Sequence, residues 1–188
     1  MEDYTGYETV KENLITSGIK ELENHGIADF SLRRVASSCN VSCAAPYKHF
    51  KSKENFIAEI ILYIYSQWDL LQKQVSEIFK NDLKKQICEI CIAYIKFWIA
   101  NPNFRSILMM RKGDIDDDRI KSHLTECTKN LIHEYCQDKA LSEHEETKKF
   151  YTVRSLIYGA ALMLDNGELE NNAETIKMIR ERIEEEFE

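Results

Sequence analysis

The amino-acid sequence predicts an all-α fold, and three features of its composition and patterning lead to this prediction. The 188-residue chain holds only 6 glycines and 2 prolines, fewer turn residues than a protein built from β-sheets requires. Hydrophobic residues make up 44% of the chain, enough for a buried core, and they recur at helical spacing. Residues that cap helices, such as Ser31 and Ser42, stand ahead of two of these periodic segments.

The first two expected helices lie near the N-terminus. Apolar side chains repeat at helical spacing over residues 10–25, and Gly26 suits the left-handed position just past a helix end. The hydroxyl of Ser31 is the expected cap of a second, short helix. That helix should end near Asn40, because asparagine tolerates turn geometry.

A third expected helix follows at once, with Ser42 as its cap and His49 near its end. Pro46 lies inside it, and its missing N–H is expected to remove one hydrogen bond and keep the helix short. Two short helices joined by a tight turn over residues 31–49 form the helix-turn-helix arrangement.

The rest of the chain also reads as helices separated by short breaks, without internal repeats or a long linker. The expected helices cover residues 53–79, 82–100, 104–110, about 116–136, 143–164 and 173–187. We therefore expect a small N-terminal domain over residues 1–52 and a larger helical domain over residues 53–188.

Charge is spread unevenly along the chain. The formal net charge is −7, yet residues 28–53 carry five basic side chains against one acid, Asp29, a local charge of +4. A short basic segment on an acidic protein favours local contact with a polyanion. A solvated helix pair with chance charge remains the alternative at this point.

The basic segment also carries a sequence resemblance. Its three parts are residues 30–36 (FSLRRVA), residues 40–42 (NVS) and residues 45–54 (APYKHFKSKE). Together they resemble the DNA-binding signature of the tetracycline-repressor (TetR) family. About 45 residues at the N-terminus carry the match, and the remainder is similar to that family only in its layout of helices.

The resemblance implies a homodimeric transcription factor, usually a repressor. In that family three N-terminal helices form the DNA-binding head, and the remaining helices bind a small effector and dimerise through the last two. Double-stranded operator DNA, a small-molecule effector and a second copy of the chain are thus the expected partners. By position, the expected DNA-binding residues are Ser31, Ser42, Cys43, Ala44, Ala45, Tyr47, Lys48, His49 and Lys53.

The expected recognition helix has an unusual composition for reading bases. Cys43, Ala44 and Ala45 offer no side chain that can form two hydrogen bonds to one base, as Arg, Asn or Gln can. We expect contacts to phosphates and the shape of the DNA to carry more of the recognition than usual.

Two further residue sets are predicted in the larger domain. Apolar stripes on the last two helices suit packing between two subunits or within one chain: Phe150, Val153, Ile157, Ala161, Leu164, Ile176, Ile179 and Ile183. An aromatic set suits either plain core or a pocket for a hydrophobic or aromatic effector: Tyr63, Trp68, Tyr94, Phe97, Trp98, Phe104, Met109, Tyr151 and Tyr158.

The sequence contains few features typical of a metal site, an enzyme or a membrane protein. Cys88 and Cys91 lack the second cysteine pair of a structural zinc site, so buried small side chains are favoured over a thiol sensor or a metal site. We expect no metal, no cofactor and no enzyme activity, because phosphate-binding loops and known nucleophile motifs are absent. We also expect no membrane span and a cytoplasmic protein. The main rival is a helical protein-interaction module that does not bind specific DNA.

Overall fold

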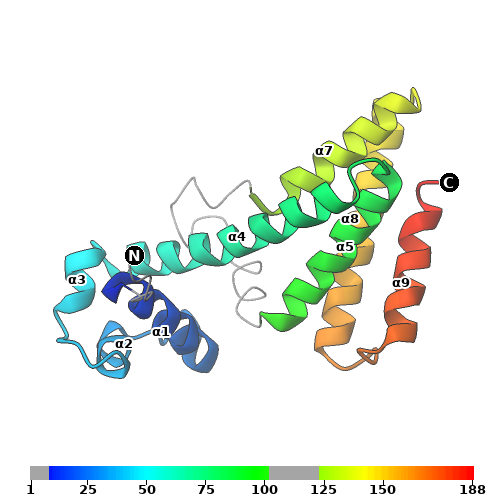
Figure 1. Cartoon of the computed structure of the whole chain (residues 1–188). Coiled ribbons are helices and arrows are strands. Elements are labelled where there is room, and N and C mark those ends of the chain that lie inside the picture. Colours follow the sequence, from blue (N-terminus) through cyan, green and yellow to red (C-terminus); the bar gives the residue numbers. More distant parts are fainter. Residues whose placement is uncertain (1–8, 102–122) are drawn as a thin grey trace, which may run out of the picture. The chain divides into compact units, whose positions relative to one another are not determined.

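The computed structural model describes residues 9–101 and 123–188, and every regular element in these two ranges is a helix (Figure 1). The all-α prediction is therefore confirmed. The helix expected over residues 104–110 and the start of the one expected from about 116 lie outside the described residues.

The chain forms two compact units that divide within helix α4 (Lys53–Ile78), between Ile64 and Tyr65. We call the described residues 9–64 the head unit, and residues 65–101 and 123–188 the C-terminal unit. The boundary predicted from the sequence, between residues 52 and 53, lies at the start of α4, 12 residues before this division.

Helices α1 (Val10–His25), α2 (Leu32–Ser38) and α3 (Ala45–His49), with the first part of α4, build the head unit. Its core centres on Phe56, which is fully buried, stacks on Phe50 at 4.1 Å between ring centroids and meets Phe30 edge-on at 5.8 Å. Gly18 lets α1 approach α4 closely, since a Cβ there would lie 2.6 Å from Cδ1 of Ile60.

The turn after α2 follows from its sequence. The backbone N–H of Val41 donates to the Ala36 carbonyl at 3.0 Å, and that of Asn40 donates to the Ser37 carbonyl at 3.1 Å. This pair of bonds is a Schellman motif, which needs a residue with positive φ. Asn40 has a φ of 54°, so the expected role of this asparagine in the turn is confirmed.

The start of α3 differs from the prediction. The helix begins at Ala45, no side chain caps it, and Ser42 contributes its carbonyl oxygen, which accepts from the Ala45 N–H at 2.8 Å. The expected hydroxyl cap is therefore wrong. Pro46 falls in the first turn, where backbone N–H groups have no acceptor inside the helix, so its ring removes no helical hydrogen bond.

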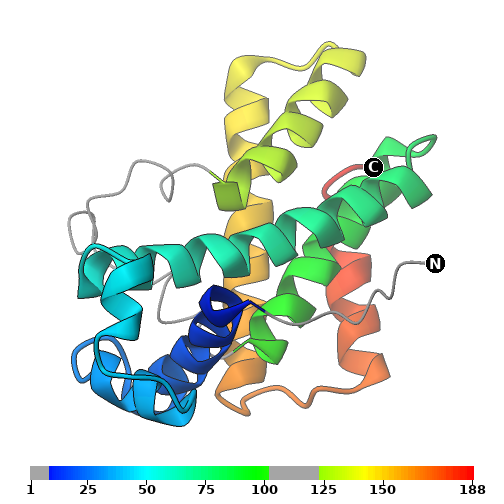
Figure 2. The same ribbon diagram turned by 60° about the vertical axis from the view of Figure 1, so that its left-hand side comes forward.

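The C-terminal unit contains α5 (Leu83–Ala100), α7 (His123–Asp138), α8 (Glu143–Asp165), α9 (Ala173–Glu185) and the second part of α4. Helix α5 is its centre and packs against α7, α8 and α9 (Figures 1 and 2). Its inward face is fully buried at Ile87, Ile90 and Ile95. The ends of α5, α8 and α9 agree with the sequence prediction to within two residues.

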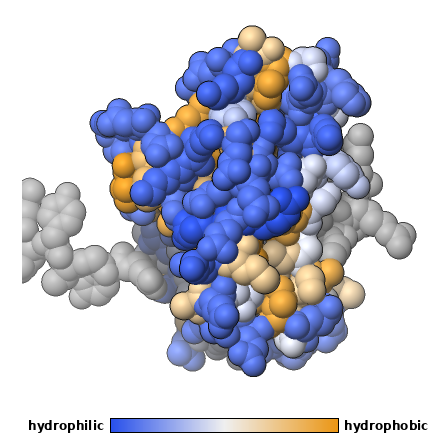
Figure 3. All heavy atoms as spheres, turned by 90° about the vertical axis from the view of Figure 1, so that its right-hand side faces the viewer, coloured by the Kyte–Doolittle hydropathy of each residue, from blue (hydrophilic) through white to orange (hydrophobic). Residues whose placement is uncertain are grey.

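The chain end is tied to the C-terminal unit. Phe187 is fully buried, its ring meets Tyr135 edge-on at 5.0 Å, and its carbonyl accepts from the Tyr135 hydroxyl at 2.9 Å. The Lys149 ammonium lies 5.5 Å from the centroid of the Phe187 ring and 5.7 Å from that of Tyr135. The face on the side of α9 is mostly hydrophilic, with hydrophobic atoms gathered in small areas (Figure 3).

None of the helices in the described ranges is both long and apolar enough to cross a membrane.

Candidate nucleic-acid interface

Helix α3 presents one face to solvent and anchors itself with the other. Pro46 within the helix and Phe50 just after it are buried in the head unit. Tyr47 is 61% exposed, although it is a large aromatic side chain. Predicted DNA-binding residues around it are also exposed, namely Ser42, Cys43, Ala44, Lys48 and His49, whereas Ala45 is half-buried. The exposed face of α3 and the three exposed residues just before it, Ser42 to Ala44, therefore carry most of the predicted set.

A second group of predicted residues comes together beside α3. An open hollow of about 530 Å³ is lined by Ser31 at the start of α2, Tyr47 on α3 and Lys53 at the start of α4. Arg33 and Arg34 of α2 line the same hollow. Guanidinium, ammonium and phenol groups around one shallow hollow are donors suited to a phosphate oxygen.

Ser31 has a capping role that was predicted correctly. Its hydroxyl accepts from the Arg34 backbone N–H at 3.4 Å, and it precedes the first residue of α2. The backbone N–H of Ser31 donates to the carboxylate of Glu21 at 3.0 Å. Its direct contribution to binding phosphate is therefore limited to its side chain.

Arg34 is held by acids of the head unit. Its Nε and Nη2 lie 2.8 and 2.5 Å from one carboxylate oxygen of Glu21, and Nη2 also donates to the Asp29 carbonyl at 2.5 Å. The hydrogen bond to Glu21 raises the pKa of Arg34 above its usual value. Because Glu21 compensates its charge, Arg34 adds little to the positive field of this surface.

Arg33 is the functional candidate that sequence reasoning missed. Arg33 belongs to the basic segment, but the resemblance does not place it among the expected DNA-binding residues. In the structure it is exposed and lines the same hollow as Lys53. The available signal was its place in the first turn of α2, two residues after Ser31.

The predicted aromatic set divides in the structure. Five members form a cluster of ring contacts in the C-terminal unit: Trp68, Tyr94, Phe97, Trp98 and Tyr158. Tyr63 belongs to the head unit, Tyr151 is 71% exposed, and Phe104 and Met109 lie outside the described residues. Burial raises the pKa of Tyr94 well above its ordinary value.

The predicted dimer stripes face inward within a single chain. Six of the eight side chains are buried by the chain's own helices: Val153, Ile157, Ala161, Leu164, Ile179 and Ile183. Phe150 and Ile176 are half-buried. The outward faces of α8 and α9 expose Tyr151, Met163 and Met178.

All six cysteines are free thiols. Cys88 and Cys91 are fully buried, and this burial raises the pKa of Cys88 to about 12 and that of Cys91 still higher. Both lie in the core as neutral, small side chains. Cys43 is the exposed thiol. In the part of the chain that the structure describes, no three His, Cys, Asp or Glu side chains gather as metal ligands would.

Comparisons with known proteins agree with this geometry. The chain is 24% identical over 112 residues to the "Probable acrEF/envCD operon repressor" of Escherichia coli K12, covering 58% of this chain and 51% of that protein. It is 26% identical over 186 residues to the "Uncharacterized HTH-type transcriptional regulator YerO" of Bacillus subtilis 168, covering 93% of this chain and 63% of that protein. The chain thus spans about half to two thirds of the length of these relatives.

Solved structures share the fold. The transcriptional regulator FadR of Bacillus subtilis, solved with stearoyl-CoA, superposes with a TM-score of 0.70 at 12% identity, covering 92% of this chain and 95% of that one. The regulator PfmR of Thermus thermophilus gives a TM-score of 0.69 at 15% identity, covering 96% and 97%. The family model described as bacterial regulatory proteins, tetR family, matches residues 14–60. This match contains the whole helix-turn-helix, so the N-terminal part of the chain is similar to the DNA-binding domain of that family.

Proposed function

We propose that this protein is a dimeric, sequence-specific DNA-binding repressor that a small effector releases from a palindromic operator. The observation that carries the proposal is the exposed face of α3 beside a hollow lined by Arg33, Tyr47 and Lys53. The chain as a whole is acidic, so this basic surface is a local feature.

The proposed contact places α3 in the major groove of DNA. Tyr47 and Lys48 reach toward the bases or the groove edge, while Arg33 and Lys53 hold phosphates on either side. Cys43 and Ala44 at the front of the helix touch thymine methyl groups or simply allow close approach. Much of the specificity then comes from DNA shape and from the spacing of the two half-sites.

Dimerisation is proposed through the outward faces of α8 and α9. Gly159 on α8 supports this choice, because a Cβ at that position would meet nothing within 4 Å in the single chain. A palindromic operator requires two heads related by a two-fold axis and separated by about 34 Å or a multiple of it.

Release by an effector requires that the effector bind one head spacing better than the other. A coupling of about 1–3 kcal/mol between the effector and operator sites would change operator affinity roughly 5- to 150-fold. The C-terminal unit is the proposed site of the effector.

Selection of bound duplexes from a random DNA pool at about 100 mM salt tests the proposal, since phosphate contacts are still strong there. The expected result is enrichment of an inverted repeat with one fixed half-site spacing. If folded, dimeric protein enriches no such repeat, the proposal is wrong and the chain is better explained as a protein-interaction module.

Charge variants then locate the interface. Removing Lys48 and Lys53 together, as Lys48→Ala with Lys53→Ala, should lower affinity and reduce the slope of log K against log salt by about 1.8. Lys129→Ala removes the same kind of charge from an exposed site on α7 and should leave both quantities unchanged. Equal losses for both sets of variants would place the DNA elsewhere.

A further inference from the structure

We propose that a hollow between α4, α5 and α7 of the C-terminal unit binds an uncharged small molecule through a carbonyl oxygen that accepts a hydrogen bond from Gln72. This inference deepens the proposed function, on which it rests, by assigning the effector a place and a chemical class.

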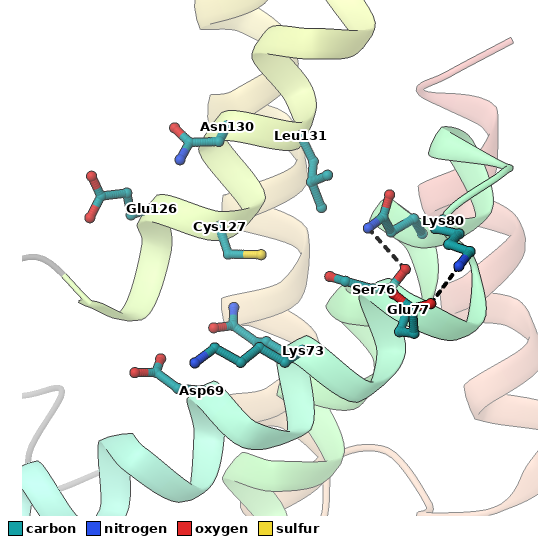
Figure 4. Close-up of a pocket in the computed structure, with 11 residues that line it drawn as sticks. Asp69, Lys73, Ser76, Glu77, Lys80, Glu126, Cys127, Asn130 and Leu131 are labelled. Atoms are coloured by element: carbon teal, nitrogen blue, oxygen red, sulfur yellow. Dashed lines mark hydrogen bonds and ion pairs between the residues drawn. The ribbon is translucent and has the colours of Figure 1, made fainter.

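The hollow has a volume of about 770 Å³, within the range of small-molecule sites. Figure 4 shows Cys127 and Leu131 pointing from α7 toward α4, where Asp69, Lys73 and Ser76 line the opposite side. All these residues belong to the C-terminal unit. The walls therefore combine apolar groups with several polar ones, as in a site for a mixed polar and apolar molecule.

Gln72 is the residue that indicates a ligand. It lines the hollow, it is only 5% exposed, and its amide nitrogen Nε2 has no hydrogen-bond partner among the residues that the structure describes. Buried donors without partners are rare, because each one loses its hydrogen bonds to water and gains none in return. A carbonyl oxygen from a bound molecule would satisfy this nitrogen.

Trp68 is a second buried donor on α4, although its ring belongs to the aromatic cluster and does not line the hollow. It precedes Gln72 by four residues on α4 and so lies on the same face one turn away. Its side chain is 1% exposed, and within residues 9–101 and 123–188 its indole Nε1 also has no hydrogen-bond partner. Both buried groups are hydrogen-bond donors, so a group that pairs with either of them must be an acceptor.

The charges around the hollow select against an anionic acceptor. Three carboxylates line it against two ammonium groups, and Lys80 is held by Glu77 at 2.5 Å. This leaves Lys73 to face the acids Asp69 and Glu126. A carboxylate ligand would meet net negative charge, whereas the oxygen of an amide or ketone would not.

The aromatic cluster predicted as the effector pocket is not part of this hollow. None of its described members lines the hollow, and their rings contact one another instead. The effector class inferred from the structure is therefore defined by a neutral carbonyl group, which the sequence did not suggest.

Tryptophan fluorescence tests the inference directly. The chain has two tryptophans, so Trp98→Phe leaves Trp68 as the single reporter, one helical turn from Gln72. Benzamide and phenylacetamide are the neutral probes, and benzoate and phenylacetate are the anions with the same carbon skeletons. The unsubstituted protein is titrated in parallel by calorimetry, so the test stands even if Trp98→Phe fails to fold.

The expected result is that the amides change the Trp68 emission and bind at least tenfold more tightly than the matched carboxylates. Gln72→Leu, which keeps the side chain's bulk but removes the donor, should weaken amide binding at least tenfold. Gln74→Leu is the matched control, because Gln74 is exposed on α4 and does not line the hollow.

Three results would overturn the inference: no binding of either amide up to about 10 mM, equal binding of amides and carboxylates, or amide binding that Gln72→Leu leaves unchanged. None of these titrations contains DNA. Failure of the duplex selection with Gln72-dependent amide binding intact would reject the proposed function alone, and the converse would reject the hollow alone.

Discussion

The head unit and the C-terminal unit treat their buried polar groups differently. In the head unit, Glu21 is 8% exposed and accepts from the backbone N–H of Ser31 and from Nε of Arg34. In the C-terminal unit, Gln72 is 5% exposed and its amide nitrogen has no partner in the described part of the chain. The buried carboxylate of the head unit is thus satisfied by groups of its own unit, whereas the buried donor of the C-terminal unit is free to bind an acceptor from a ligand.

Removing the carboxylate of Glu21 should have the largest effect. Glu21→Ala leaves the N–H of Ser31 and the guanidinium of Arg34 without their shared acceptor and should destabilise the protein by about 1–3 kcal/mol. We expect a lower urea midpoint with an unchanged slope, and faster hydrogen exchange at residues 29–34. An unchanged midpoint would show that the network contributes nothing to stability.

Substitution of Gln72 is expected to raise the stability of the protein, in contrast to Glu21→Ala. Gln72→Met keeps a side chain of similar length and removes the unpartnered donor, so it should stabilise the ligand-free protein by about 1 kcal/mol. Thermal unfolding without added ligand measures this, with Gln74→Met as the control. A clear loss of stability in Gln72→Met would mean that the native amide has a partner in solution.

The turns after α2 in the head unit and after α7 in the C-terminal unit have the same backbone conformation but different residues. Asn40 in the head unit and Ala140 after α7 both have positive φ, at 54° and 51°, in the same type of hydrogen-bonded turn. Alanine is strained in this conformation, whereas glycine is not. Ala140→Gly should therefore stabilise the protein by about 0.5 kcal/mol, and Asn40→Ala should destabilise it by about 1 kcal/mol. Chemical unfolding of both variants checks the two signs.

The smallest expected effect concerns two similar helix starts. Thr9 and Glu12 form a capping box at the start of α1, and Ser142 and Glu145 form one at the start of α8. Hydrogen bonds from the backbone N–H groups of Thr9 and Ser142 lower the pKa of the Glu12 and Glu145 carboxyls. A lowered folded-state pKa means that each cap stabilises the protein at neutral pH and is lost as pH falls through that value, below about 4.5. NMR titration of Glu12 and Glu145 should show both lowered midpoints. Glu145→Gln should remove one titration and leave the other unchanged.

The sequence predicted the head unit in detail because its signals are contiguous. Caps, turn and basic residues all fall within residues 30–54, so the short spacing left few arrangements, and Asn40 lies where the turn required it. The role of Ser42 was predicted less well, because a short helix that starts on Ala45 uses backbone groups as its cap.

In the C-terminal unit the sequence predicted the helices and an aromatic effector pocket, but not the hollow beside Gln72. Its hollow draws residues from positions 69 to 131 on three helices, and no local pattern links Gln72 with Asn130. Amphipathic stripes such as Ile157 and Ile183 indicate that a face is buried, yet they do not indicate whether the same chain or a second one buries it.

The exposure of Cys43 has a practical consequence for any study of assembly. Two molecules in air can join through this thiol, since it is the exposed one of the six. Such a covalent pair would have the mass of the proposed dimer while holding the two α3 helices against each other. Samples for measuring mass therefore need a reducing agent or Cys43→Ser, and the same thiol offers a single position for attaching a dye beside the DNA surface.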